Sequence, residues 1–538
     1  MSAAPYRQPG SGGIGDETSA RSSYTSLLRL SPGFVLAVIA IADAGRFADP
    51  DMWWHLLAGE TVLRTGHFIM RDPFSYTAHG LPWLDHERIA EVIMAWTYMT
   101  GGIVGLKLFK LACTAITFVM IALTIAETGA NRSIQSCVLM VAAVGLGAAI
   151  QFRPQLFTFI CFSALMLLLT RHNYGRTKRL WLIVPLMLLW ANLHGGYLVG
   201  LLVFGFYGFV VVIRDVVVGK DWRKDAISFA IIWPAALAMT FITPFGLNNW
   251  RAIVRTLSNP MTHGLIAEWK PMLAVMMRHV RRHSLAMIMD GIIAGAMAAF
   301  VVTELLTLTL DDLPLALIAG ISTAAAIVAI RNMEIAMIAL PAPLAHHAAL
   351  MGERLRGRRK SLPPAESGLA GRRMMIINQV VFGVMAVAVM FVTGLFSKQL
   401  VTGIPEPTGA IDYMRSRGLR GNILCDFNWG GYVIYHTAPR SRVFTDSRYD
   451  LVYPNSITAE YLKFIWDKPG ADRMLDEWPH DFVLISPKSP AWRLMTSRRD
   501  WKLLYRDPDC ALFARANSPA ANAASAAVIG KAQTSYFP

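Results

Sequence analysis

The stretch DPDMWWH, which begins at Asp49 and follows an apolar run, combines acidic, aromatic and imidazole side chains. Asp51, His55 and Gly59 recur every four residues, so in a helix they share one face. A carboxylate beside apolar surface can have a raised pKa and act as a general base. Asp49 precedes Pro50, where a helix N-cap is expected, and hydrogen bonds from backbone N–H groups would lower its pKa. We therefore predict that Asp51 is the catalytic base and Asp49 mainly a cap, with Asp49 as the alternate base.

A purely structural role for this stretch is also open. Asp49 would cap the helix and Asp51 would complement the helix dipole. Trp53 and Trp54 would belong to the aromatic belt at a membrane interface. This interpretation leaves His55 without a role, and we predict that His55 contacts substrate.

A second acidic group, WLDHER, occupies residues 83–88. Its structural interpretation is a capped helix start, with Asp85 ahead of a helix that runs from Glu87. Its functional interpretation is a substrate site, because Asp85, His86 and Glu87 offer carboxylates and an imidazole on the same loop as the first acidic stretch. An Asp/His/Glu set can also bind Mg²⁺ or Mn²⁺, so Asp85 and Glu87 are candidate metal ligands.

Two arginines stand in short polar turns between apolar runs, Arg153 in QFRPQ and Arg331 in RNME. Such an arginine can extend to the membrane interface, or it can clamp a phosphate with parallel hydrogen bonds. His194 lies in NLHGG, whose glycines allow close approach of the backbone, although a lone histidine can equally be structural. We predict phosphate or substrate contacts for these three side chains.

The pair Glu268 and Trp269, in EWKP, could contact a sugar, with the indole stacked on a pyranose face. Trp269 could equally belong to the aromatic belt. The chain contains no Walker loop, no GxGxxG, no CxxC pair and no HExxH motif. It therefore lacks the signatures of nucleotide-driven or zinc chemistry.

The elements that must position these residues are membrane helices. Of the 538 residues, 54% are hydrophobic and 16% are charged, against about 25% charged in a soluble protein. Several apolar runs approach the roughly 20 residues that cross a bilayer. The net charge of +15 comes from basic residues clustered between these runs, which is the positive-inside pattern and no sign of nucleic-acid binding. We predict a polytopic α-helical membrane protein.

About eleven transmembrane helices are predicted. They cover roughly residues 31–48, 104–126, 134–150, 155–170, 180–192, 195–213, 226–243, 286–306, 313–330, 333–350 and 375–396. The segment 89–99 is too short to span and is predicted to lie at the interface. With the N-terminus in the cytoplasm, the basic connections 171–179, 214–224 and 354–360 fall inside, and the odd number of spans puts residues 397–538 outside.

This topology brings all the polar motifs described above to the outer face, so we predict an active site there. The predicted organisation is a disordered cytoplasmic N-terminus (1–30), a transmembrane domain (31–398) with an outer loop (49–103), an extracytoplasmic domain (399–515) and a disordered tail (516–538). Helical stretches in the outer domain alternate with β-like runs, which predicts a small α/β domain. Those runs are NILCDF, SRVFTD, DFVLIS, WKLLYR and CALFAR.

Two further features concern processing and oxidation. A signal peptide is an alternative reading of the first apolar run, because the triplet at 42–44 (ADA) resembles a cleavage site. Residue 49 lies outside on either reading. Cys425 and Cys510 both lie in the outer domain, and we predict that they occupy neighbouring strands and could form a disulfide.

The motifs together resemble the GT-C superfamily of membrane glycosyltransferases. More narrowly, DPDMWWHLLAGETVLRTGHFIMRDPFSYTAHGLPWLDHE, RPQLFTF, NLHGGYLVG, PFGLNNW, EWKP and RNMEIAM resemble bacterial proteins grouped with dolichyl-phosphate-mannose protein mannosyltransferase-like enzymes (glycosyltransferase family 39-like). WGGYVIY and RVFTDSRYD resemble the outer domain of that group, and the resemblance covers about residues 30–515. After DHE, relatives often carry an aromatic residue where this chain has Arg88, which either changes the loop packing or adds a cation.

The resemblance implies an inverting, hexosyltransferase-like enzyme of the bacterial inner membrane. Its donor would be a sugar linked to a polyprenyl phosphate, and its acceptor a lipid, glycan or protein outside the cytoplasm. Carried over, the base of the first outer loop falls on Asp51, with Asp49 as alternate. A transporter and a non-catalytic scaffold for surface polysaccharide assembly are the alternatives, and Glu304, an acid within a span, is the residue that favours a transporter.

Overall fold

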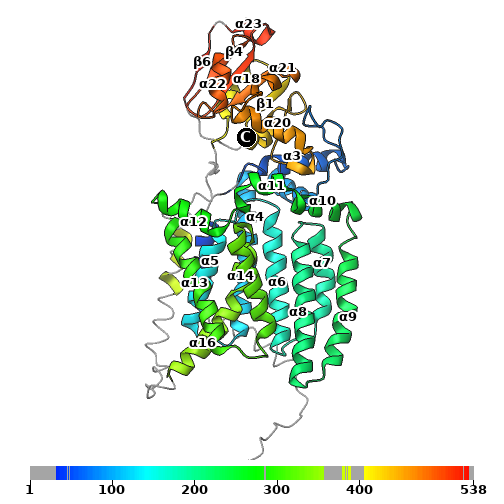
Figure 1. Cartoon of the computed structure of the whole chain (residues 1–538), viewed down its shortest axis with the longest axis vertical. Coiled ribbons are helices and arrows are strands. Elements are labelled where there is room, and N and C mark those ends of the chain that lie inside the picture. The colour runs from blue at the N-terminus through cyan, green and yellow to red at the C-terminus, as the bar shows by residue number, and fades with distance from the viewer. Residues whose placement is uncertain are drawn as a thin grey trace, which may run out of the picture.

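The computed structural model describes residues 32–44, 47, 49–283, 286–356, parts of 379–388, 405–524 and 526–531. Figure 1 shows a bundle of long helices with a small α/β domain stacked on one end. The predicted N-terminal segment 1–30, the basic connection after residue 356 and most of the predicted last span lie outside the described residues.

The bundle consists of apolar helices joined by short connections. Their bounds are α2 Pro32–Asp43, α4 Arg88–Glu127, α5 Arg132–Gly147, α6 Gln155–Asn173, α7 Ile183–Ala191, α8 Tyr197–Val218, α9 Trp222–Met239, α13 Ala286–Thr307, α14 Leu313–Val328, α15 Met333–Ala339 and α16 Pro341–Arg356. Large apolar side chains cover the outside of the bundle, and Leu202, Phe209 and Leu305 are 61%, 63% and 80% exposed. A broad apolar surface of this kind suits contact with lipid.

Four of these helices, α4, α6, α8 and α13, are long and apolar enough to cross a membrane, and a fifth span results if the bent pair at 330–355 counts as one. The apolar helices α2, α5, α7 and α14 are shorter. Each predicted span up to residue 350 overlaps one or two helices, so the chain is a polytopic helical membrane protein. The predicted count of about eleven spans is not confirmed.

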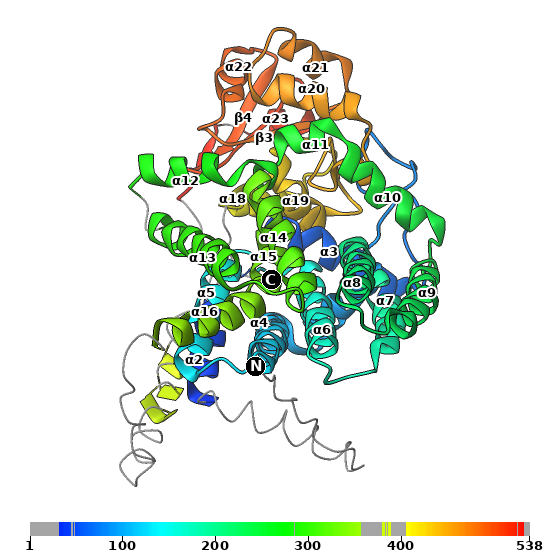
Figure 2. The same cartoon turned by 60° about the horizontal axis from the view of Figure 1, so that its bottom comes forward.

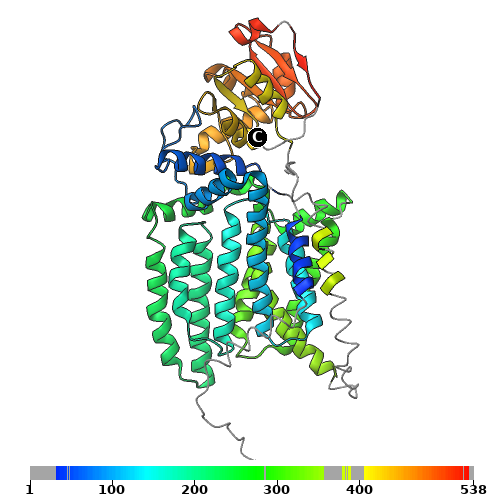
Figure 3. The same cartoon turned by 180° about the vertical axis from the view of Figure 1, so that it is seen from behind.

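The outer loop lies across the end of the bundle, beneath the α/β domain (Figure 3). It contains α3, Met52–Thr65, and the first part of α4, which breaks at Gly102 (φ 57°, ψ −153°). Glycine adopts this left-handed backbone without steric cost, so the chain can turn there from the loop into the long apolar part of α4. The predicted interfacial segment 89–99 is the part of α4 before this break.

Three more helices lie across the same end of the bundle (Figures 1 and 2). They are α10 Leu247–Ser258, α11 Pro260–Leu265 and α12 Met272–Arg281. The motifs PFGLNNW and EWKP lie in this region, which forms a helical layer between the bundle and the outer domain.

The C-terminal domain is a six-stranded sheet in the order β2-β1-β3-β5-β4-β6. The strands are β1 Asn422–Cys425, β2 Arg442–Val443, β3 Phe482–Ile485, β4 Trp501–Arg506, β5 Ala511–Arg515 and β6 Val528–Ile529. Its helices are α18 Thr408–Ser416, α19 Gly430–Thr437, α20 Asn455–Ile465, α21 Ala471–Glu477, α22 Ala491–Ser497 and α23 Pro519–Ala523. The strands β1, β2 and β3 are parallel, β5 is antiparallel to β3 and β4, and β6 is parallel to β4.

Each of the five β-like runs contains one of β1 to β5, which confirms the predicted α/β domain. Two other predictions for this region are corrected. The sheet continues through β6, so α23 (Pro519–Ala523) and β6 (Val528–Ile529) are regular elements inside the segment predicted to be a disordered tail. Cys425 lies on β1, and Cys510 precedes β5 with β3 in between. Strands two places apart are separated by about 9–10 Å, too far for a disulfide, and both thiols are free and buried.

The outer loop and the C-terminal domain share one hydrophobic core rather than two. Trp53 and Trp83 of the loop belong to the same buried cluster as Ile423 and Leu484 of the sheet. The Val443 N–H donates a hydrogen bond to the Phe74 carbonyl at 3.0 Å, so the outer loop pairs with the edge strand β2. The core therefore holds the loop at a fixed position against the domain.

A buried ionic network strengthens this junction. Arg448 of the domain lies 2.8 Å from Asp72 of the loop and 2.6 Å from Asp446, and all three side chains are fully buried. The Tyr453 hydroxyl donates a hydrogen bond to Asp446 at 2.9 Å, and the Ser75 N–H donates one to Asp72 at 3.0 Å. Charges that are paired and hydrogen-bonded in this way can be buried.

Candidate functional site

The start of α3 presents two aspartates to the space between bundle and domain. The helix begins at Met52, and Asp51 just before it already has helical backbone angles and makes no side-chain capping bond. Asp49 makes the predicted capping bond, because its Oδ1 accepts a hydrogen bond from the Asp51 N–H at 2.9 Å. Both carboxylates remain partly exposed, with 16% and 17% of the side-chain surface open.

Arg153 draws three carboxylates together. In the turn between α5 and α6, its guanidinium lies 2.7 Å from Asp49, 2.8 Å from Asp51 and 3.6 Å from Glu268. The aspartates come from the outer loop and Glu268 from the layer of α10 to α12, so segments distant in sequence meet at one cation. Three acids around one arginine leave net negative charge at this point.

The surrounding protein and the nearby charges shift the pKa values of Asp49 and Asp51. Burial raises the pKa of Asp49 to about 7, although the nearby Arg153 opposes the shift. Burial likewise raises the pKa of Asp51 against the effect of Arg153. The prediction that backbone N–H groups hold the pKa of Asp49 low is wrong, because the loss of water outweighs one hydrogen bond. Both aspartates thus have the basicity of a general base.

A second cluster forms around Glu87 at the start of α4. Its carboxylate lies 3.1 Å from His194 Nε2 and 3.7 Å from both His86 Nε2 and His55 Nε2. Although burial alone would raise the pKa of Glu87, the hydrogen bond from His194 and the other neighbouring imidazoles bring it well below the usual range. Glu87 is therefore a carboxylate that stays ionised at neutral pH.

The tautomer of His194 follows from its neighbours. The Gly196 N–H donates to His194 Nδ1 at 3.0 Å, so Nδ1 is an acceptor and Nε2 carries the proton that faces Glu87. Thr158 Oγ1 lies 2.7 Å from the same Nδ1 and accepts a hydrogen bond from Trp190 Nε1 at 2.8 Å. Burial lowers the pKa of His194, which keeps the ring neutral. These bonds fix the direction in which His194 donates.

His55 is held between two glutamates. Its Nδ1 lies 2.8 Å from Glu91 Oε1, and burial lowers its pKa to about 3. The expectation that Gly59 continues the substrate-facing side of α3 is not met, because a side chain there would collide with the Glu91 carbonyl. Gly59 serves the close crossing of α3 and α4, whereas His55 lies beside a cavity with Asp51.

Two cavities meet at Arg153. The larger, of about 310 Å³, has a wall of Val144, Met272, Met276, Met289, Ile293, Ile330 and Met333. The smaller, of about 230 Å³, is lined by Asp51, His55, His86, Glu87, His194, Trp269 and Tyr449, among others. The side chains shared by both cavities are Arg153, Gln155, Arg331 and Glu334. The larger cavity thus has a broad apolar wall, although Glu268, His279 and Asp290 also line it. The smaller cavity carries Asp51, Glu87 and three imidazoles, and Arg153 and Arg331 lie where the two cavities meet.

Glu268, Trp269 and Arg331 form the edge between the cavities. Arg331 lies 5.2 Å from the centre of the Trp269 ring and 4.0 Å from Glu268. The ring of His263 stacks on Trp269, with 4.1 Å between the ring centres. Because Arg331 is 37% exposed, its guanidinium is accessible to a ligand.

The predicted metal ligands, Asp85 and Glu87, do not face a common point. Asp85 lies 3.4 Å from Arg88 and its Oδ1 accepts a hydrogen bond from the Glu87 N–H at 3.0 Å, so it supports the turn. Asp49 and Asp85 line neither cavity, unlike the other predicted site residues. Arg88 is buried, with its guanidinium 4.0 Å from the centre of the Phe245 ring, so it packs the loop and does not reach the cavities. A divalent cation on Glu87 would instead find imidazoles beside it.

Sequence reasoning missed several residues of the two cavities. Gln155 and Glu334 stand in the quoted motifs QFRPQ and RNME, and their side chains are hydrogen-bonded to each other. Ser447 and Tyr449 reach the smaller cavity from the C-terminal domain. The motif RVFTDSRYD contains both, and its polar residues after a short strand were the available signal.

The comparisons with known proteins rest on structure. No family model matches the chain, and no curated protein matches it by sequence. The Archaeoglobus fulgidus oligosaccharyltransferase, tethered with an acceptor peptide, superimposes with a TM-score of 0.53 at 12% identity, over 86% of this chain and 69% of that one. Its apo form gives 0.51 at 11% identity, over 86% and 70%. ArnT from Cupriavidus metallidurans, bound to undecaprenyl phosphate, gives 0.49 at 10% identity, over 93% and 98%.

The chain therefore shares the overall fold of the oligosaccharyltransferase. The likeness covers 86% of this chain. At this level of identity it shows the fold alone, and the chemistry has to be argued from the site.

Proposed function

We propose that this protein is a membrane glycosyltransferase that moves a sugar from a polyprenyl-phosphate donor to an acceptor outside the cytoplasm. The observation that carries the proposal is the pair of cavities that share Arg153 and Arg331. An amphiphilic donor needs an apolar groove beside a cation, and an acceptor needs a polar site beside a base. The shared fold and the resemblance of the motifs support the same activity.

The larger cavity suits the donor lipid. Its methionine and isoleucine wall can pack against isoprene units, and methionine adapts to irregular shapes. Arg331 is partly exposed at its edge, and Arg153 lies at the boundary with the smaller cavity. Two guanidinium groups can bind the donor phosphate with charge-assisted hydrogen bonds. The sugar would then project into the smaller cavity.

Binding of the phosphate would also prepare the base. Arg153 is paired with Asp49 and Asp51 in the structure, and a phosphate would compete with them for the same donors. An aspartate released from this ion pair, in a site that already raises its pKa, becomes more basic. Asp51 lines the acceptor cavity and Asp49 does not, so we assign the base to Asp51.

The reaction is then a single displacement with inversion. Asp51 takes the proton of the acceptor hydroxyl as the acceptor oxygen bonds to the anomeric carbon. The bond from that carbon to the phosphate oxygen breaks, and the electron pair leaves with the polyprenyl phosphate. Arg153 and Arg331 stabilise the charge that develops on the leaving phosphate. The fixed N–H of His194 and the ionised Glu87 orient hydroxyl groups of the sugar or acceptor, with or without Mg²⁺ or Mn²⁺.

The experiment uses the purified full chain in lipid nanodiscs. Undecaprenyl-phosphate sugars of several kinds are supplied, with an envelope extract from cells that lack the protein as the source of acceptor. Mass spectrometry follows the release of undecaprenyl phosphate. We expect release from one donor class by the wild type and at least about 100-fold slower release by Asp51→Asn. No release from any donor would favour a transporter or a scaffold and refute the proposal.

We place the enzyme in the bacterial inner membrane, with the N-terminus in the cytoplasm and the C-terminal domain outside. The charge pattern supports this orientation, because the basic connections 171–179 and 214–224 lie at the bundle end opposite the outer domain. Single cysteines at positions 358 and 429, in otherwise cysteine-free protein, would test it with a membrane-impermeant thiol reagent on intact cells. We expect labelling at the outer position only, and the inverse pattern would reverse the topology. The wild-type residue at the outer position, Trp429, is buried, so labelling there is compared with that of the same protein after denaturation.

A further inference from the structure

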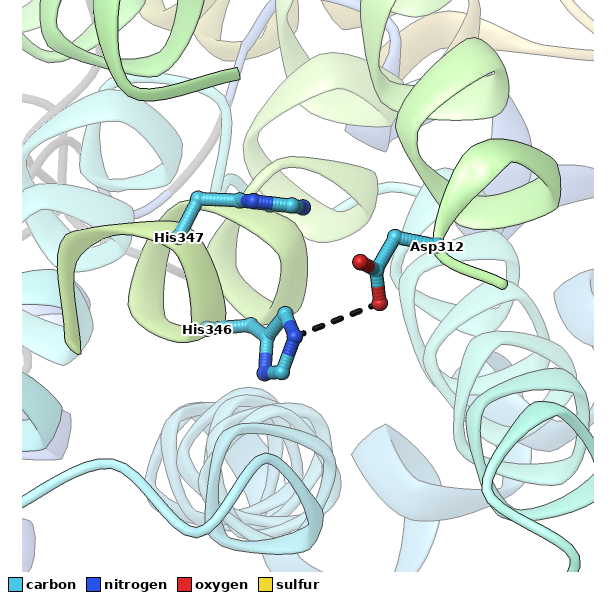
Figure 4. A group of neighbouring side chains, drawn as sticks. All are labelled: Asp312, His346 and His347. Carbon is cyan, nitrogen blue, oxygen red and sulfur yellow. Dashed lines mark ion pairs between the residues drawn. The ribbon is translucent and has the colours of Figure 1, made fainter. Parts of the chain in front are cut away.

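Two histidines and an aspartate meet at the end of the bundle far from the C-terminal domain. His346 and His347 are adjacent on α16, and Asp312 precedes α14 (Figure 4). One ligand atom from each of the three residues lies within 4.8 Å of the other two. None of them belongs to the cavities described above, and the site does not depend on the proposed function.

The spacing of these atoms is close to that of a metal site. His346 Nε2 lies 3.2 Å from Asp312 Oδ1. Two ligands bound to Zn²⁺ at about 2.0–2.1 Å in a tetrahedron stand about 3.3 Å apart. The pair already has this separation, and the 4.8 Å limit means that the third ligand atom has to move by about 1.7 Å at most. A cation could be accommodated without moving a helix.

Neighbouring hydroxyl groups orient the ligands. The Thr307 hydroxyl donates its proton to the Thr303 carbonyl at 2.7 Å, so its oxygen accepts from His347 Nδ1 at 2.7 Å. This leaves the lone pair of a neutral His347 on Nε2. The Thr309 hydroxyl donates to Asp312 Oδ2 at 2.5 Å, which leaves Oδ1 to face His346. Ligating side chains are commonly held by such outer hydrogen bonds.

Glu304 supplies an independent observation. It is only 8% exposed, and neither of its carboxylate oxygens accepts a hydrogen bond within the described part of the chain. Its Oε1 lies 3.2 Å from His347 Nε2, so two lone pairs face each other. A buried pair of this kind needs a positive charge or a proton between or beside the two atoms. A cation at the Asp312 cluster would supply that charge.

We propose that Asp312, His346 and His347 bind a divalent transition-metal ion, with Zn²⁺ as the best match. Imidazole nitrogen with one carboxylate suits Zn²⁺ better than Mg²⁺ or Ca²⁺, which prefer oxygen ligands throughout. Three protein ligands leave a fourth position for water or for the nearby Glu304. The ion would fasten α16 to the turn between α13 and α14 at the end of the bundle opposite the sugar-transfer site.

The test measures zinc in the full-length protein, purified in detergent through an affinity tag that contains no histidine. After equilibration with Zn²⁺ and removal of unbound metal, elemental mass spectrometry should find about one zinc per chain. The variants His346→Ala and His347→Ala should lose it. Thr307→Val keeps all three ligands and should bind zinc about 10–100-fold more weakly, since it removes only the outer hydrogen bond. Co²⁺ should give the visible spectrum of a tetrahedral site in the wild type and not in His346→Ala or His347→Ala.

A matched control is His279→Ala, which removes a histidine 2.7 Å from a carboxylate, that of Asp290, at the other end of the bundle. It should keep the full zinc content. Zinc should also raise the melting temperature of the wild type and leave that of His347→Ala unchanged. The proposal fails if the wild type binds no more zinc than the two ligand variants, whether because all bind adventitious metal or because a proton alone occupies the site.

Discussion

Arg448 and Arg153 each stand between two aspartates, and the two clusters differ in what else surrounds them. Arg448 binds Asp72 and Asp446 in a fully buried network. Arg153 binds Asp49 and Asp51 beside two cavities, with all three side chains partly exposed. The same ion-pair pattern thus occurs both in the core that joins loop and domain and at the proposed active site.

The hydrogen bonds explain the difference. Although burial alone would raise it, the pKa of Asp72 is lowered by the charge of Arg448 and by bonds from Ser75 and the Phe74 N–H. The carboxylate of Asp51 accepts from no backbone N–H in the described part of the chain, and burial raises its pKa despite Arg153, Ser447 and Trp54. A carboxylate with every oxygen satisfied stabilises the fold, whereas one that shares a single cation with other acids remains available for reaction.

The first prediction concerns the largest effect. Arg448→Met removes the cation between two buried aspartates, and loss of one partner from a buried ion network costs about 3–5 kcal/mol of stability. We expect a lower melting temperature in detergent and faster proteolysis of the outer domain. Arg153→Met, at the exposed counterpart, should leave melting nearly unchanged while sugar transfer is lost. Equal melting of the two variants would remove the distinction between the clusters.

The second prediction concerns donor binding. Arg331→Gln removes a partly exposed cation from the edge of the larger cavity. A hydrogen bond to a charged group contributes about 1.5–3 kcal/mol, or roughly 10–100-fold in affinity. Native mass spectrometry with undecaprenyl phosphate can measure this loss. Arg442→Gln, an exposed arginine on β2, is the control and should bind like the wild type. Unchanged affinity in Arg331→Gln would show that the phosphate lies elsewhere.

The third prediction uses pH to separate the clusters. The base must be ionised, and the pKa of Asp49 is about 7 with that of Asp51 also raised, so transfer should fall as pH drops below about 7. The pKa of Asp72 is lowered, so its contribution to stability is present above the ordinary aspartate pKa and is lost only as pH falls through the lowered value. Between pH 7 and 5, activity should therefore fall while the melting temperature holds. A pH–rate profile that is flat over this range would contradict the raised pKa of the base.

The fourth and smallest effect is expected for Asp49→Asn. The amide can still accept the hydrogen bond from the Asp51 N–H, so the start of α3 should be preserved. Removal of a neighbouring negative charge should lower the pKa of Asp51 and move the rise of the pH–rate profile to lower pH. Much of the activity at neutral pH should remain. An inactive Asp49→Asn protein with an active Asp51→Asn protein would reverse the two roles.

The sequence predicts which residues belong to the site better than it predicts which of them contact each other. Asp51, Arg153, His194 and Arg331 all reach the cavities, because polar motifs at the ends of apolar runs have to gather at a membrane interface. The strands of the outer domain are likewise visible as short apolar runs. Local patterns do not reveal which acid meets which cation, so the sharing of Arg153 between three carboxylates came only from the structure.

The sequence-based predictions are wrong where contacts between residues distant in sequence determine the structure. Gly59 continues the spacing of Asp51 and His55, yet it lies at the close crossing of α3 and α4 and not at the cavity. The pairing of Cys425 with Cys510 failed because strand order does not follow chain order, and β3 comes between them. Tyr449 lines the smaller cavity because of how the C-terminal domain docks on the outer loop. A local sequence pattern does not predict this docking.

The central claim is that Asp51 acts in the chemical step while Arg153 binds the donor phosphate, and one variant tests both parts. Asp51→Asn removes the base and also one of the carboxylates that compete for Arg153. We predict that release of undecaprenyl phosphate from the glycosylated donor falls by about 10²–10⁴, while undecaprenyl phosphate binds at least as tightly as to the wild type. Measured on the same nanodisc preparation, wild-type turnover in Asp51→Asn, or a loss of binding that matches the loss of turnover, would contradict the account.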